Sequence, residues 1–98
     1  MAPAEPAPPG SRQRQRGDGS WVLVVPDEHW MSEAESRHVL RGGRLRLANA
    51  VQHGRVTRVE NTAGKPGYLR STVEREAQWW AGTPRWRRFV RFLTDNGS

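Results

Sequence analysis

Residues 21–35 have the sequence WVLVVPDEHWMSEAE, which combines a strand signal with a helix signal. The first five residues, 21–25, form a continuous apolar run that is mostly β-branched, and Pro26 stops it. A run of this length and composition is typical of a strand that is buried on both faces. We therefore expect a strand over residues 21–25, and we expect the ordered part of the chain to begin there.

A helix should follow this strand, because Ser32 and Glu35 match a capping box. In that motif the serine oxygen accepts a hydrogen bond from the backbone N–H of the third residue after it, which satisfies a free donor at the start of a helix. The glycines at 42 and 43 are typical of a helix end. The pattern predicts a helix over about 33–41.

The segment that precedes the strand has a different composition. Residues 1–20 are rich in proline, glycine, serine and arginine, and they contain no large apolar side chain after Met1. Such a segment cannot bury enough apolar surface to offset the entropy lost on ordering. We expect a disordered Pro/Arg-rich arm over 1–20, a single small globular domain over 21–94 and a frayed tail over 95–98.

The middle of the chain carries weaker signals. Arginine and leucine alternate over residues 44–48 as in a strand, although 47–51 would also suit a helix, and we expect a strand. Residues 55–59 are predicted as another strand. Residues 62–67 are rich in turn-forming types and are predicted as a loop.

Two further helices are expected near the C-terminus. Ser71 with Glu74 matches a second capping box, which predicts a helix over about 72–81. A threonine–proline pair then supplies an N-cap and a first-turn proline for a third helix, over about 84–94. The expected fold class is α+β. It comprises a short sheet (about 21–25, 44–48 and 55–59) and three helices (about 33–41, 72–81 and 84–94) behind the disordered N-terminal arm.

The chain is strongly basic, with 16 Lys+Arg against 10 Asp+Glu and a formal net charge of +6. Lys65 is its only lysine. Residues 21–43 are net acidic, so most of the positive charge lies after Gly43. Arginine binds phosphate oxygens through its fork of donors and stacks on bases, so this placement favours nucleic-acid binding. The alternative for the last helix is a solvated face whose arginines reflect codon bias.

The five tryptophans supply a second signal. Trp79 lies off the apolar stripe of its helix and is the candidate for an exposed contact that stacks on unpaired bases. Trp80 continues that stripe, so we expect it in the core, and we expect the same of Trp86. Trp21 is expected to pack, and Trp30 is either a packing or a stacking residue.

Catalysis, disulfide bonds and metal binding find little support. The chain has no cysteine, and its three histidines are scattered without the spacing of a zinc site. No nucleophile elbow, phosphate-binding loop or dinucleotide motif is present. No apolar run is long enough to span a bilayer, and residues 1–20 lack the apolar stretch of a signal peptide. We expect an intracellular protein, in the cytoplasm, or in the cytoplasm or nucleus of a host cell if it is viral.

We therefore expect a non-catalytic nucleic-acid-binding protein without a cofactor. RNA is favoured over DNA because arginine-rich arms that order on binding are common in RNA recognition. The small core also favours a homodimer or a larger complex. The alternative is a protein-binding adaptor or inhibitor that engages an acidic protein partner, such as a viral or phage accessory protein. The candidate contact residues are Arg44, Arg46, Arg55, Arg58, Arg70, Trp79, Arg85, Arg87, Arg88 and Arg91.

Overall fold

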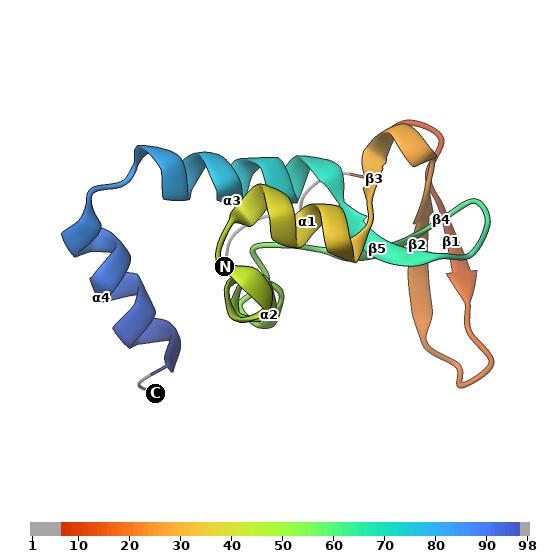
Figure 1. Ribbon diagram of the computed structural model, residues 1–98. Coiled ribbons are helices and arrows are strands. Elements are labelled where there is room, and N and C mark those ends of the chain that lie inside the picture. Colours follow the sequence, from red (N-terminus) through yellow and green to blue (C-terminus); the bar gives the residue numbers. More distant parts are fainter. Residues whose placement is uncertain (1–6, 97–98) are drawn as a thin grey trace.

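The computed structural model describes residues 7–96, which form a five-stranded sheet and four α-helices. The α+β class is therefore confirmed, with one α-helix more than expected. The sheet lies at one end of the molecule, α1, α2 and α3 lie beside it, and α4 lies at the far end (Figure 1). The elements are β1 (Arg12–Gln15), β2 (Trp21–Val25), the short 3-10 helix η1 (Asp27–His29), β3 (Trp30–Met31), α1 (Glu33–Leu40), α2 (Gly43–Gln52), β4 (Arg58–Asn61), β5 (Pro66–Leu69), α3 (Arg70–Gly82) and α4 (Arg85–Asn96).

The strand predicted over 21–25 is confirmed as β2, and its bounds are as expected. The order of the strands in the sheet is β1-β2-β4-β5-β3. β2 pairs with β4 in parallel, with Val24 opposite Glu60, whereas the other three pairs are antiparallel. A parallel pair needs a long crossover connection, and α1 and α2 lie in the connection between these two strands.

The main core lies where the first three α-helices meet the β3–β5 end of the sheet. A smaller second cluster, Val25, Val59 and Leu69, lies within the sheet and is covered in part by Trp30. Full burial of a large apolar side chain contributes about 1.5–3 kcal/mol. The main cluster therefore holds the helices on the sheet, and its members are Met31, Leu40, Leu47, Ala50, Val56, Tyr68 and Val73.

The start of the first helix is also confirmed. Ser32 is the N-cap of α1, and its hydroxyl accepts a hydrogen bond of 3.1 Å from the backbone N–H of Glu35. The helix ends at Leu40, one residue before the predicted end. Arg41 takes the left-handed conformation, with φ 61°, that glycine was expected to supply.

The strand predicted over 44–48 is wrong, because α2 is helical throughout these residues. Leu47 and Ala50 are buried in the main core at a spacing of one helical turn, with Val51 packed beside them. A strand would have placed Leu45 on the same face as Leu47, yet Leu45 is 55% exposed. These residues therefore form a helix that buries apolar residues at helical spacing, although the alternation of arginine and leucine indicated a strand.

The prediction for the β4–β5 region is correct in part. β4 begins at Arg58, three residues later than expected, and the predicted loop gives way to β5 at Pro66. A Cβ at Gly67 would lie 2.3 Å from the indole nitrogen of Trp30. The glycine that suggested a loop is thus required for close packing against Trp30 in β3.

The expectation of a disordered arm is wrong for Arg12–Gln15, which forms β1 along the edge of β2. Two arginines at this edge, Arg14 and Arg16, form ion pairs with the buried carboxylate of Glu60 in β4. Backbone pairing and these ion pairs order a strand whose side chains are all exposed. Residues 1–6 of the predicted arm lie outside the described residues.

The second predicted capping box is wrong as well. α3 follows β5 directly, with Leu69 as N-cap and no side-chain capping bond. The hydroxyl of Thr72 instead donates to the carbonyl of Leu69 at 2.7 Å. The helix contains the predicted span of 72–81 and ends at Gly82. α4 continues to Asn96 and so includes two residues of the predicted tail, whereas 97–98 lie outside the described residues.

Replacing Ser32 with alanine should lower the free energy of unfolding by about 1 kcal/mol, because the N–H of Glu35 would lose its acceptor. Urea denaturation measures the change. Ser32→Asp keeps an acceptor at the cap and should stay within about 0.5 kcal/mol of the parent protein. Equal losses in both variants would contradict the capping role.

Candidate nucleic-acid interface

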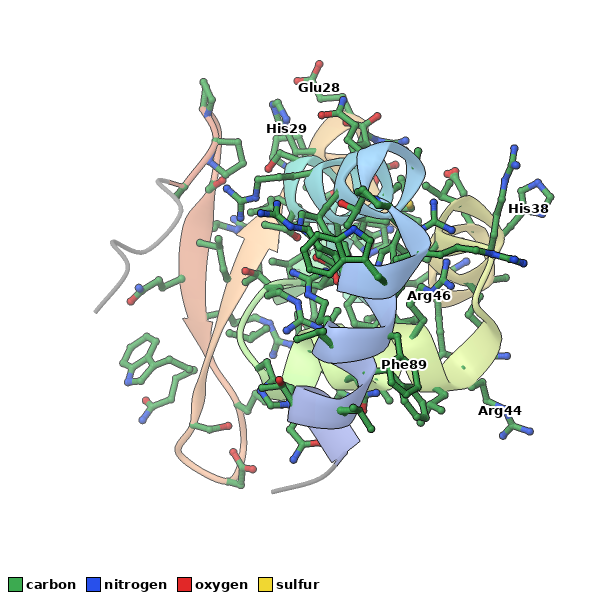
Figure 2. All side chains as sticks on the ribbon, turned by 90° about the vertical axis from the view of Figure 1, so that its left-hand side faces the viewer. Glu28, His29, His38, Arg44, Arg46 and Phe89 are labelled. Carbon is green, nitrogen blue, oxygen red and sulfur yellow. The ribbon has the colours of Figure 1, made fainter. Side chains whose placement is uncertain are left out.

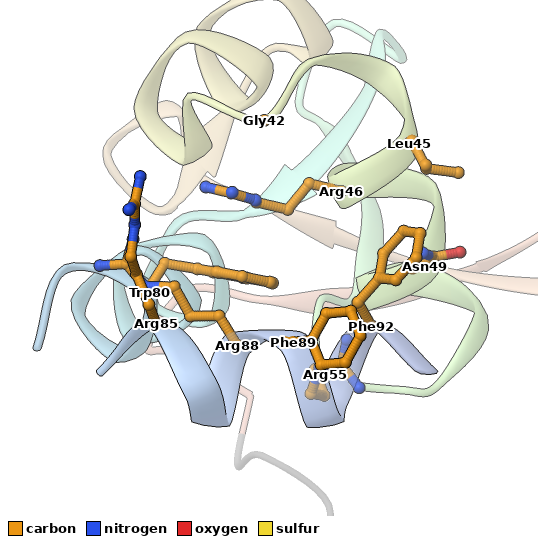
Figure 3. A pocket seen from close by; sticks show the side chains of 10 residues that line it. All are labelled: Gly42, Leu45, Arg46, Asn49, Arg55, Trp80, Arg85, Arg88, Phe89 and Phe92. Atoms are coloured by element: carbon orange, nitrogen blue, oxygen red, sulfur yellow. The ribbon is translucent and has the colours of Figure 1, made fainter. Parts of the chain in front are cut away.

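A cavity of about 380 Å³ lies between α2, α3 and α4 (Figure 3). Of the ten described residues that line it, four are arginines, three are aromatic and none is acidic. This combination places cationic donors and flat apolar surfaces around one space. The lining residues are Gly42, Leu45, Arg46, Asn49, Arg55, Trp80, Arg85, Arg88, Phe89 and Phe92.

Arg46 reaches the cavity from α2 and is fixed there by three neighbours. Its guanidinium lies 3.8 Å from the centre of the Trp80 ring, and its Nη1 donates to the carbonyl of Leu40 at 2.7 Å. Gly42 leaves the space that this path needs, since a Cβ there would lie 2.3 Å from Nε of Arg46. A stacked guanidinium of this kind is worth about 0.5–2 kcal/mol.

Beneath the cavity, the carboxylate of Glu76 in α3 bonds to side chains from the loop before β4, from α3 itself and from α4. The residue is only 4% exposed, and its Oε2 accepts from Nε of Arg55 at 3.1 Å and from Nη1 of Arg91 at 3.1 Å. The indole N–H of Trp80 donates to the same oxygen at 3.2 Å. A buried carboxylate is tolerated only with such partners, so Glu76 fixes both the loop before β4 and α4.

Trp79 and Trp80 are both half-buried. Trp79 was expected to be exposed and Trp80 to lie in the core, so each prediction is only partly met. Their rings meet edge to face, with centroids 5.0 Å apart. The guanidinium of Arg91 lies 3.6 Å from the centre of the Trp79 ring and covers it. Trp80 lines the cavity instead of the core. The ring that the cavity presents is therefore that of Trp80.

The cavity carries more positive charge than its neighbours neutralise. Burial lowers the pKa of the Arg46 guanidinium, the like charge of Arg88 lowers it further, and the carboxylate of Glu76 opposes the shift. The Nε of Arg88 is buried and has no hydrogen-bond partner among the described residues. An anion in the cavity would oppose the repulsion between Arg46 and Arg88.

α4 is turned opposite to the sequence expectation. Trp86, Val90 and Leu93 lie about one turn apart on a side that faces solvent, with 65%, 52% and 51% of their surface exposed. The expectation that Trp86 lies in the core is therefore wrong. Arg91 faces α3, where Glu76 and Trp79 hold it. Phe89 extends from α4 on the side of α2 and Arg46 (Figure 2).

Six of the ten candidate contact residues lie in or beside this cavity. Arg46, Arg55, Arg85 and Arg88 line it. Arg91 shares Glu76 with Arg55, and Trp79 contacts Trp80. Trp80, Phe89 and Phe92 were not among the candidate contact residues, and Trp80 was expected in the core because it continues the apolar stripe of its helix.

The other four candidates lie elsewhere. Arg44 and Arg58 line a separate hollow next to α1, away from the cavity that Arg46 and Arg55 line. Arg70 donates to the carbonyl of Trp30 at 3.0 Å and pairs with Glu35, which ties α3 to the β3–α1 region. Arg87 lies over the exposed ring of Trp86 on the outer side of α4.

Trp21 was expected to pack, but 62% of it is exposed at the start of β2. Trp30 is half-buried against the smaller core cluster, so of the two roles expected for it, packing and stacking, it has the packing role.

Within residues 7–96, no three His, Asp or Glu side chains are grouped so that they could hold a metal ion. None of the helices in this part of the chain has the length and apolarity needed to cross a membrane.

Comparison of the chain with models of protein families, with curated proteins and with solved structures gave no match.

Replacing Glu76 with glutamine should lower the free energy of unfolding by about 3 kcal/mol, because Arg55 and Arg91 would lose a buried counter-charge. Urea denaturation followed by circular dichroism measures the loss. Glu74→Gln changes an exposed carboxylate on the same helix and should stay within about 0.5 kcal/mol of the parent protein. A Glu76→Gln variant as stable as the Glu74→Gln control would contradict the role of Glu76.

Proposed function

We propose that the protein binds RNA without catalysing a reaction, and that the cavity between α2, α3 and α4 is the centre of the interface. The observation that carries the proposal is the lining of that cavity, with four arginines, three aromatic rings and no acidic side chain. Proteins that bind single-stranded nucleic acids combine a basic groove for the phosphates with aromatic rings for the bases. Both components are present here within one site.

The unbalanced charge supports a polyanionic partner. Arg46 and Arg88 repel one another across the cavity, and Glu76 is already shared between Arg55 and Arg91. Phosphate groups accept the forked hydrogen bonds that guanidinium groups donate. A nucleic acid would bring one phosphate to the cavity and further phosphates to the arginines around it, whereas a small anion would bring only one.

Unpaired RNA is the favoured nucleic acid for two reasons. The rings in the cavity would be useful only to bases whose faces are free, and sequence-specific RNA recognition targets such unpaired bases. A cavity of about 380 Å³ is also too small for a base-paired duplex. Single-stranded DNA offers the same phosphates and similar bases, so it is the closest competitor.

The intracellular location stays a prediction from the sequence.

The apolar side of α4 favours protein binding as the second candidate function. Trp86, Val90 and Leu93 are each more than half exposed, and none of them lines the cavity. Amphipathic helices of this kind bind in apolar grooves of partner proteins, and flanking arginines favour an acidic partner. The adaptor or inhibitor that engages an acidic protein partner, or a homodimer, would use this surface.

The test is a comparison of single-stranded RNA, single-stranded DNA, double-stranded RNA and double-stranded DNA by fluorescence anisotropy across a salt series. We expect single-stranded RNA to bind most tightly, with the logarithm of the association constant falling against the logarithm of salt with a slope of about −3. That slope follows from about 0.7 per phosphate and about four phosphate contacts along the strand, one in the cavity and the others at arginines around it.

A pair of charge-matched variants locates the interface. Arg85→Gln with Arg88→Gln removes two cations from the cavity lining, whereas Arg12→Gln with Lys65→Gln removes two exposed cations that lie outside it. The first variant should lose about tenfold or more in affinity for single-stranded RNA at 100 mM salt, and the second less than threefold. Absence of nucleic-acid binding at 50 mM salt would overturn the proposal in favour of protein binding.

A further inference from the structure

We propose that the cavity between α2, α3 and α4 accepts one unpaired nucleotide, with its phosphate at Arg85 and Arg88 and its base against the phenyl rings of α4. This inference rests on the proposed RNA binding and assigns the unit that the site recognises. Figure 3 shows that the cavity has two chemically different ends. Arg85 and Arg88 lie at one end, with Arg46 and Trp80 in the middle. The other end holds Phe89, Phe92, Leu45, Asn49 and Arg55, whose charge is paired with Glu76.

The cationic end suits a phosphate group. Arg85 and Arg88 both line this end, and a phosphate accepts the forked hydrogen bonds that guanidinium groups donate. The like charge of Arg88 already destabilises the protonated form of Arg46. A phosphate bound at Arg85 and Arg88 would add attractions that oppose this repulsion.

The other end suits a nucleobase. The rings of Phe89 and Phe92 offer flat apolar surface, and both residues are about half exposed, with 61% and 48% of their surface accessible. Base–aromatic stacking contributes about 1–3 kcal/mol per base. The amide of Asn49 adds one donor group and one acceptor at the same end, which matches the polar edge of a base.

The two ends together select a nucleotide over simpler ligands. An inorganic anion would occupy only the arginine end, and an apolar molecule would occupy only the phenyl end. The volume of about 380 Å³ lies near the lower limit of small-molecule sites, which fits one nucleotide and leaves its neighbours in the strand outside. The rest of an RNA strand would then contact other arginines.

Titration of the full chain with uridine monophosphate, uridine and inorganic phosphate, followed by NMR of the tryptophan indole N–H groups, tests the inference. We expect the monophosphate to shift the indole resonance of Trp80, which lines the cavity, and to leave that of Trp86 unchanged. Its affinity should exceed that of either fragment by about tenfold, because it engages both ends. Phosphate or uridine binding as tightly as the monophosphate would overturn the inference.

Adjacent arginines on α4 provide the matched variants. Arg88 lines the cavity, whereas Arg87 lies over Trp86 on the outer side. Arg88→Gln should weaken monophosphate binding by about fivefold or more, and Arg87→Gln by less than twofold. Phe89→Leu keeps an apolar side chain without an aromatic ring and should weaken monophosphate binding without changing phosphate binding. Equal effects of the two arginine variants, with folding confirmed by circular dichroism, would contradict the site.

The inference and the proposed function can fail separately. If single-stranded RNA binds but the monophosphate shifts no indole resonance, the nucleotide site is wrong and RNA binding stands. If neither ligand binds at 50 mM salt, both proposals are wrong.

Discussion

The carboxylate of Glu76 is the contact on which the functional end of the molecule depends. It is almost fully buried, and one of its oxygens accepts from Arg55, Arg91 and Trp80. Removing one partner from a buried ion pair costs about 3–5 kcal/mol, which is large against the stability of a small domain. The pairing with Arg91, reinforced by Arg91 stacking on Trp79, sets the rotation of α4. Arg88 and Arg91 are consequently partly buried, whereas Trp86, Val90 and Leu93 face solvent.

This rotation explains the two chemical features of the C-terminal region together. With Arg91 held against α3, Arg85, Arg88 and the two phenylalanines of α4 border the space beside α2, where Arg46 lies over Trp80. A cationic and aromatic cavity results. The same rotation leaves large apolar side chains exposed, each of which burial would otherwise stabilise by about 1.5–3 kcal/mol. The proposed RNA binding uses the cavity, whereas protein binding, the second candidate function, would use the exposed apolar side chains of α4.

Local signals in the sequence predicted part of the fold. The β-branched run of β2 and the Ser32 cap of α1 depend on neighbouring residues alone, and both are confirmed. β1, β3 and β5 were missed because their order depends on distant partners, as in the ion pair of Arg14 with Glu60 and the packing of Trp30 on Gly67. The arginines of the cavity were predicted from charge. The aromatic residues were not, because helical periodicity identifies an apolar face without showing whether that face lies inward.

Both binding surfaces depend on the orientation of α4, which nuclear Overhauser effects between α4 and α3 measure. The structure predicts strong effects between the side-chain protons of Arg91 and the ring of Trp79, since the guanidinium lies 3.6 Å from the ring centre. The Arg91 protons should also be shifted upfield by the ring. Effects from the methyl groups of Val90 and Leu93 to Trp79 or Trp80, with none from Arg91, would show that the apolar side faces inward and would contradict the account.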